Sequence, residues 1–111
     1  MTRLHLHIEE RSGCSVLHLY GELDMTTEDV FVNACASLLR QNQTKIIIDA
    51  SGLGFCDCAA LGGMIKWQRE AEQRGGFLRL VGVQGPLARL LTVAELIDTF
   101  PPYADLQQAC G

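Results

Sequence analysis

The sequence has no excess of positive charge. Nine Lys and Arg residues stand against 13 Asp and Glu residues, which gives a formal net charge of −4, and the basic residues are scattered along the chain. Proteins that bind nucleic acid concentrate Lys and Arg on one face, where they neutralise phosphates. We therefore expect that nucleic acid is not a partner of this protein.

Long hydrophobic runs are also missing. The first ten residues, MTRLHLHIEE, carry charge and histidine throughout, so they lack the apolar core of about 7 to 15 residues that a secretion signal needs. No other run approaches the roughly 20 apolar residues of a membrane-spanning helix. These patterns predict a cytoplasmic protein with no membrane partner.

The short motifs of common small enzymes are absent from the sequence. The phosphate-binding patterns GxxxxGK[ST] and GxGxxG, the zinc pattern HExxH and the nucleophile pattern GxSxG do not occur. We therefore expect a protein that is not an enzyme and that holds no cofactor.

The cysteines follow no framework of a disulfide-rich secreted domain. They are odd in number, at Cys14, Cys35, Cys56, Cys58 and Cys110. This usage is typical of a reducing compartment, and we expect free thiols that mostly serve as small apolar residues.

The composition is that of an ordinary globular chain. Hydrophobic residues make up 48% and charged residues 20% of the 111 positions, far from the composition of disordered proteins. A chain of this length can bury one core, so we expect a single domain over residues 1–111.

The first twenty residues predict a β-hairpin. LHLHI at 4–8 alternates strictly, VLHLY at 16–20 follows the same period, and Arg11 to Gly13 would form the turn. The expected register places Glu9 opposite Cys14 and His5 opposite His18. One face then carries the polar set His5, His7, His18 and Tyr20. Since no carboxylate or thiolate at ligand spacing completes a metal site, we interpret this face as a solvated surface.

The remaining chain alternates helical and strand patterns. Gly21 is expected to end the second strand, and Thr26 or Thr27 to cap a helix that runs to about Gln41. Three consecutive isoleucines at 46–48 predict a central parallel strand, which ends near Asp49 in a glycine-rich turn.

Further elements follow in the second half of the chain. The patterns predict a helix over 59–74, a strand over 77–83, a helix from Pro86 to about residue 94, a short edge strand at 97–100 and a last helix within 101–110. The fold class is therefore α/β, with a mixed, mostly parallel sheet of four to five strands and about four helices.

Two segments resemble a known family. IIIDASGLGFCDCAALGGMI at 46–65 is similar to the signature segment of STAS domains, specifically of bacterial anti-sigma-factor antagonists, and GELD at 21–24 is similar to a second segment of that family. The resemblance spans nearly the whole chain and implies a STAS-like fold. It also implies binding to an anti-sigma factor, in some cases a serine kinase, which releases a sigma factor for transcription.

The resemblance also implies site residues. In that family a serine that follows an aspartate is phosphorylated by the anti-sigma factor. Asp57 matches the aspartate, Cys58 falls on the phosphoserine, and Ala60 stands where glycine is usual. The implied partner-binding residues are Asp24, Phe55, Cys56, Asp57, Cys58 and Ala59.

Cys58 changes what the resemblance implies about regulation. A serine kinase needs a hydroxyl, and a thiol does not provide one. The modification that adds about −1.5 to −2 charges is therefore expected to be lost at this position. Alternatives are phosphorylation of Ser51, expected in the turn upstream, or oxidation of Cys58 in place of phosphorylation.

Other interpretations of this segment remain open. Asp57 can be a helix N-cap, with Cys56 and Cys58 as packing residues. The two cysteines can also form a thiol redox sensor, although residues two apart in a strand have Cα atoms about 6.6 Å apart, so a bridge needs a tight turn. A third interpretation is a STAS subunit of a transport or stress-signalling complex. No pattern specifies the oligomeric state.

Overall fold

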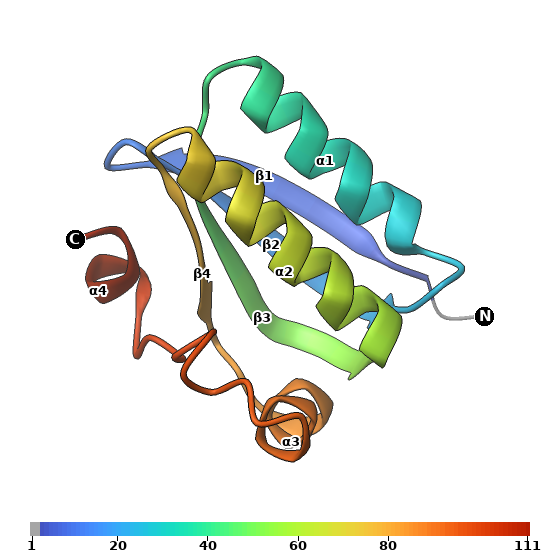
Figure 1. Cartoon of the computed structure of the whole chain (residues 1–111). Helices are drawn as coiled ribbons and strands as arrows, with labels where there is room; N and C mark the ends of the chain where they lie inside the picture. The colour runs from blue at the N-terminus through green and yellow to red at the C-terminus, as the bar shows by residue number, and fades with distance from the viewer. Residues whose placement is uncertain (1–2) are drawn as a thin grey trace.

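The computed structural model describes residues 3–111 and places a mixed sheet between helices (Figure 1). The strands are β1 (His5–Arg11), β2 (Cys14–Leu23), β3 (Lys45–Cys56) and β4 (Phe77–Val81). The helices are α1 (Glu28–Arg40), α2 (Cys58–Gln73), α3 (Gly85–Val93) and α4 (Leu106–Cys110). None of these helices is both long enough and apolar enough to cross a bilayer. The predicted α/β fold is confirmed, with four strands in the sheet.

The sheet order is β1-β2-β3-β4. β1 pairs with β2 in the antiparallel direction. β3 is parallel to both of its neighbours, β2 and β4. Helices α1 and α2 lie side by side over one face, and α4 lies on the other (Figure 1). The connections therefore bring the carboxyl ends of β2 and β3 to the same edge of the molecule.

The three isoleucines of β3 contribute to both sides of the sheet. Ile46 and Ile48 belong to the main core, which also contains buried residues of α1, α2 and α3. Ile47 points the other way, into a smaller cluster with Val16, Val81 and Ala109 of α4. All three isoleucines are fully buried, as expected for a strand that is covered on both faces.

The hairpin forms as predicted, but its register is different. Arg11 pairs with Cys14 and His7 with His18, so the expected pairing of Glu9 with Cys14 and of His5 with His18 is wrong. The turn has only two residues, Ser12 and Gly13, with φ of 55° and 82°. Such a turn matches the twist of paired strands. Because the register shifts by two residues, the side chains keep their expected faces.

Gly21 does not end β2, contrary to expectation. The strand continues to Leu23, with an irregularity in its pairing to β3 directly after Gly21. The φ of Gly21 is +106°, and a Cβ at this position would collide with the carbonyl oxygen of Arg3. Glycine therefore allows the strand to continue through a backbone conformation that other residues rarely adopt.

β3 is much longer than predicted. Residues 50–54 were expected to form a turn, but they continue the strand to Cys56, and Ser51 lies within it. Leu53 pairs with Gly21, and Cys56 pairs with Leu23. The extended partner strand supplies hydrogen bonds that outweigh the weak strand propensity of the glycines.

The edge strand expected at residues 97–100 is not found in the described part of the chain. Instead, Tyr103 forms an isolated parallel bridge with Val81, and its amide donates a hydrogen bond to the carbonyl of Leu80 at 3.0 Å. Two prolines, Pro101 and Pro102, precede this bridge and have no N–H group to donate to a sheet.

Two of the five cysteines are joined, so the expectation of free thiols throughout is wrong. Cys14 and Cys110 form a disulfide across a sequence separation of 96 residues. Cys35, Cys56 and Cys58 are free. The bridge arises because α4 returns to the first residue of β2, a long-range contact that cysteine spacing does not predict.

Candidate functional site

Asp57 connects the two segments that the sequence singled out. It precedes α2 as the N-cap residue, and its Oδ1 accepts a hydrogen bond from the amide of Ala60 at 2.8 Å. Its Oδ2 accepts a second hydrogen bond from the amide of Met25 at 3.2 Å. The interpretation of Asp57 as a helix cap is therefore confirmed, and the same carboxylate holds the loop after β2 against the start of α2.

Asp24 organises the loop that precedes α1. Its Oδ1 accepts hydrogen bonds from the hydroxyl and the amide of Thr26, at 2.7 and 2.8 Å, and from the amide of Thr27 at 3.2 Å. The hydrogen bonds from Thr26 are the main cause that lowers the pKa of Asp24. A fixed negative charge therefore lies at the N-terminus of α1, which the helix dipole favours.

Thr27 is the N-cap residue of α1, but its side chain does not cap the helix. Its hydroxyl donates a hydrogen bond to the carbonyl oxygen of Glu22 at 2.8 Å. Thr27 therefore occupies the predicted N-cap position without a side-chain cap, and Asp24 instead accepts the amides of the turn before α1.

Apolar side chains that lie near these carboxylates in the sequence are open to solvent. Met25 is 76% exposed and Phe55 is 43% exposed, and Cys58 and Ala59 are exposed at the start of α2. We refer to the half-buried and exposed residues of this region as the strand-end surface: Asp24, Met25, Phe55, Asp57, Cys58 and Ala59. Met25 was missed by the sequence analysis, although it directly follows the GELD segment.

Cys56 is not part of this surface. Its side chain is buried at the end of β3, and burial, followed by the charge of Asp57, raises the pKa of its thiol to about 12. Cys56 therefore remains protonated at neutral pH. Cys58, as the first residue of α2, is exposed. The two cysteines that the sequence placed together lie in different environments.

Ala60 and Leu61 belong to the core below the surface. Both side chains are buried in the main cluster, and the amide of Leu61 continues the helix by donating to the carbonyl of Asp57 at 3.1 Å. The methyl group of Ala60, at the position where glycine is usual in the family it resembles, is therefore accommodated by packing.

A second polar cluster lies on the face of the sheet opposite to α1 and α2. The Nδ1 of His18 is 2.7 Å from Asp49 Oδ2, and its Nε2 is 2.9 Å from Glu9 Oε1. His7 stacks on His18 with ring centroids 5.9 Å apart. This face was predicted to be a solvated polar surface, but it carries a hydrogen-bonded ion cluster. No group of residues suited to a metal ion occurs within residues 3–111.

The electrostatics of this cluster favour a protonated His18. Burial by itself lowers the pKa of His18, but the hydrogen bonds to Glu9 and Asp49 outweigh it, and the pKa is raised. Both ring nitrogens point at carboxylates. In its protonated form His18 therefore donates to both of them and joins β1, β2 and β3.

The sequence matches a family model and a curated relative. Residues 6–101 match the family model described as "Mlab, STAS domain". A curated relative, the anti-sigma F factor antagonist of Paenibacillus polymyxa, is 28% identical over 101 residues, which cover 90% of this chain and 86% of the relative.

Solved structures show the same fold. An anti-sigma factor antagonist from Mycobacterium paratuberculosis superposes with a TM-score of 0.84 at 24% identity, covering 96% of this chain and 90% of that one. A sulfate transporter family protein from Wolinella succinogenes gives a TM-score of 0.73 at 16% identity, covering 92% and 85%. The fold implied by the sequence resemblance is thereby confirmed. Since the family model matches most of its residues, the chain belongs to the STAS domain family.

Proposed function

We propose that this protein is a cytoplasmic anti-sigma-factor antagonist, a non-enzymatic module that binds an anti-sigma factor and so releases a sigma factor for transcription. The observation that carries the proposal is the hydrogen bond from the Met25 amide to Asp57 at 3.2 Å. It holds the residue that follows the GELD segment against the aspartate of the other family-like segment, within one exposed surface. The relative from Paenibacillus polymyxa supports the same role.

The chemistry of the strand-end surface suits a protein partner. Methionine and aromatic residues are enriched at protein interfaces, and Met25 and Phe55 are the exposed apolar side chains here. The carboxylates of Asp24 and Asp57 lie beside them and are already fixed by backbone amides. We therefore expect the partner to present an apolar pocket with a positively charged rim.

Cys58 determines whether phosphorylation can switch off the proposed interaction. The residue is exposed at the first position of α2, where the phosphoserine of the family would lie. A phosphate there would add about −1.5 to −2 charges beside two carboxylates. A thiol does not accept phosphate from a serine kinase, so we propose an antagonist that remains active in the presence of such a kinase.

Binding to candidate anti-sigma factors, measured by calorimetry with purified proteins, tests the proposal. Met25→Ala and Phe55→Ala should each weaken binding by about tenfold or more, as truncation of an interface anchor does. Val93→Ala is the matched control, because Val93 is 81% exposed but lies on α3, outside the strand-end surface. Unchanged affinity in both surface variants, or binding to no anti-sigma factor, contradicts the proposal.

The alternatives are less well supported by the geometry. A redox bridge between Cys56 and Cys58 uses both sulfur atoms, but Cys56 is buried, and burial raises the pKa of its thiol to about 12. For a subunit of a transport complex, the likeness to the Wolinella succinogenes structure extends to the fold alone. Neither alternative uses the exposed Met25 and Phe55.

A further inference from the structure

We propose that Cys14 and Cys110 form a reversible thiol–disulfide exchange site that fastens α4 to the start of β2. Cys14 is the first residue of β2 and Cys110 the last of α4, and their Cα atoms are 6.2 Å apart. The strand-end surface lies at the opposite end of β2, beyond Leu23. The inference is therefore independent of the proposed function.

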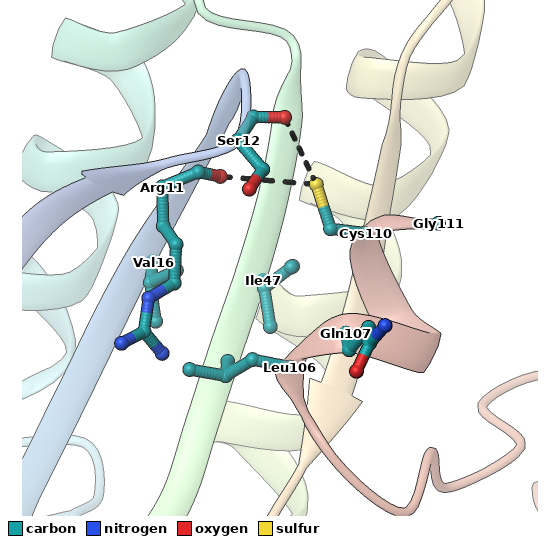
Figure 2. A pocket seen from close by; sticks show the side chains of 8 residues that line it. All are labelled: Arg11, Ser12, Val16, Ile47, Leu106, Gln107, Cys110 and Gly111. Carbon is teal, nitrogen blue, oxygen red and sulfur yellow. Dashed lines mark hydrogen bonds between the residues drawn. The ribbon is translucent and has the colours of Figure 1, made fainter.

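Of the two bridged cysteines, Cys110 is the one that is accessible to a reductant. Cys14 is 0% exposed, whereas Cys110 is half-buried beside the β1–β2 turn (Figure 2). Thiol–disulfide exchange requires a thiolate to reach a disulfide sulfur. The geometry therefore directs a reductant to the Sγ of Cys110 and makes the Sγ of Cys14 the leaving group.

The reaction is a two-electron exchange with a dithiol reductant. One thiolate of the reductant attacks Cys110 Sγ, the bond to Cys14 breaks, and Cys14 leaves as a thiolate that takes up a proton. The second thiol of the reductant then releases Cys110, and the reductant becomes a disulfide. In the reverse direction a small disulfide such as oxidised glutathione accepts the two electrons and is released as two thiols.

The surroundings of Cys110 accommodate both states. Its Sγ lies 3.4 Å from the carbonyl oxygen of Ser12 and 3.8 Å from that of Arg11, as the dashed lines in Figure 2 mark. In the thiol form the S–H group can donate to these carbonyls. In the disulfide form the sulfur has no proton, so the same approaches are van der Waals contacts.

Loss of the bridge should loosen α4, because its other attachments are few. The helix has five residues and is too short to be stable alone. Ala109 is buried against Val16 and Ile47, and Arg79 Nη1 donates to the carbonyl of Ala109 at 2.7 Å. Beside these contacts a hollow of about 420 Å³ opens between Arg11 and Leu106.

The other cysteines differ from this pair. Burial raises the pKa of the Cys35 and Cys56 thiols to about 12 in each case, which makes them poor nucleophiles. Cys58 is the exposed free cysteine of the described chain. Thiols are kept reduced in a reducing compartment, so there we expect the Cys14–Cys110 bridge to be open and to form on oxidation.

The test uses a Cys58→Ser background, which removes the exposed thiol. The protein is equilibrated with dithiothreitol or with oxidised glutathione and is then alkylated in denaturant. Its intact mass is measured by mass spectrometry. We expect two fewer alkylated thiols after oxidation. Hydrogen exchange of the α4 amides should be on the order of tenfold faster in the reduced form, whereas the amide of Ala60 should exchange equally in both.

Cys110→Ser in the same background is the matched variant. Its α4 amides should exchange at the fast, reduced rate under both conditions, and Cys14 should be alkylated in both. The proposal is overturned if oxidised glutathione leaves both thiols free, or if the α4 amides exchange at one rate in the oxidised and reduced forms. It is also overturned if dithiothreitol fails to open the bridge in the folded protein.

Discussion

The amide of Met25 donates a hydrogen bond to the carboxylate of Asp57 at 3.2 Å, across a separation of 32 residues. The other oxygen of that carboxylate caps α2 through the amide of Ala60. One side chain therefore fixes the loop after β2 relative to the helix that follows β3. The position of the exposed Met25 depends on this link.

Two replacements of Asp57 should distinguish how much each of its two hydrogen bonds contributes to stability. Asp57→Ala removes both and should lower the free energy of unfolding by about 0.5–2 kcal/mol, as loss of an N-cap does. Asp57→Asn keeps an oxygen for Ala60 but turns an NH₂ group toward the Met25 amide, so it should cost less. Urea denaturation measures both values, and hydrogen exchange at Met25 should quicken in both. Equal stability of Asp57→Ala and the wild type would refute the capping role.

Truncation of the Ile47 side chain should strongly lower the free energy of unfolding. It is fully buried between β3 and α4, and Ile47→Ala should lower the free energy of unfolding by about 2–5 kcal/mol. Ile97→Ala is the control, since Ile97 is 40% exposed and should lose far less. Urea melts of the two variants give the comparison, and a loss below about 1 kcal/mol for Ile47→Ala contradicts the central position of β3.

Two glycines with positive φ should respond differently to alanine. Gly13 has φ of 82° and free space around its Cα, whereas Gly21 has φ of 106° and the carbonyl of Arg3 in the way. Gly13→Ala should cost about 1–2 kcal/mol from backbone strain alone. Gly21→Ala should cost at least about 1 kcal/mol more because of the clash. Thermal unfolding of both variants checks the difference, which equal costs would disprove.

Stability should fall as the pH rises through the pKa of His18. That pKa is raised above the ordinary value of 6.5 in the folded state, so protonated His18 stabilises the fold fully below 6.5 and loses this effect at higher pH. The pKa of Glu9 is lowered mainly by the hydrogen bond from His18. For Asp49, burial is outweighed by hydrogen bonds from Ser51 and His18, and its pKa is also lowered. The contributions of these carboxylates are lost at acid pH.

The measurement is urea denaturation from about pH 6, just below the ordinary histidine pKa, to about pH 9. His18→Gln should flatten the decline that the wild type shows. His5→Gln, a change at an exposed position of β1, should leave the decline in place. An identical slope for His18→Gln and the wild type would show that the cluster does not act in this way.

Phosphorylation should depend on residue 58 alone. Incubation with a candidate anti-sigma kinase and ATP should leave the wild type unmodified, because Cys58 offers no hydroxyl. Cys58→Ser should gain one phosphate, detected by intact mass. A phosphate on the wild-type protein would instead point to another acceptor, of which Ser51 in β3 is the nearest serine upstream.

Local patterns predicted the elements whose side chains repeat regularly. The helix α1 and the strand around the isoleucines of β3 were predicted because period and hydrophobicity agree there. The second half of β3 was missed because Ser51, Gly52 and Gly54 favour turns in isolation. It is a strand only because β2 continues beside it, and that long-range pairing leaves no mark in the local sequence.

The site was predicted in part. Asp24 and Asp57 were placed in one region by resemblance, and the structure brings them together through Met25. The resemblance assigned Cys56 to the partner surface, but it is buried, as the alternative interpretation of Cys56 as a packing residue predicted. Residue type alone did not decide between the two, because a cysteine suits surface and core alike. The bond between Cys14 and Cys110 was missed because it depends on where the last helix ends, at a distance of 96 residues.

The two borders of the sheet are shielded in different ways against β-aggregation. Along β4, the bridge from Tyr103 to Val81 occupies part of the outer backbone, so an incoming strand finds fewer unpaired groups there. Along β1, the shielding is chemical: the strand contains Glu9, Glu10 and Arg11 within its seven residues. Charged side chains discourage the addition of a foreign strand. The protein should therefore tolerate high concentration without forming fibrils, even though an apolar Ile8 is exposed on that strand.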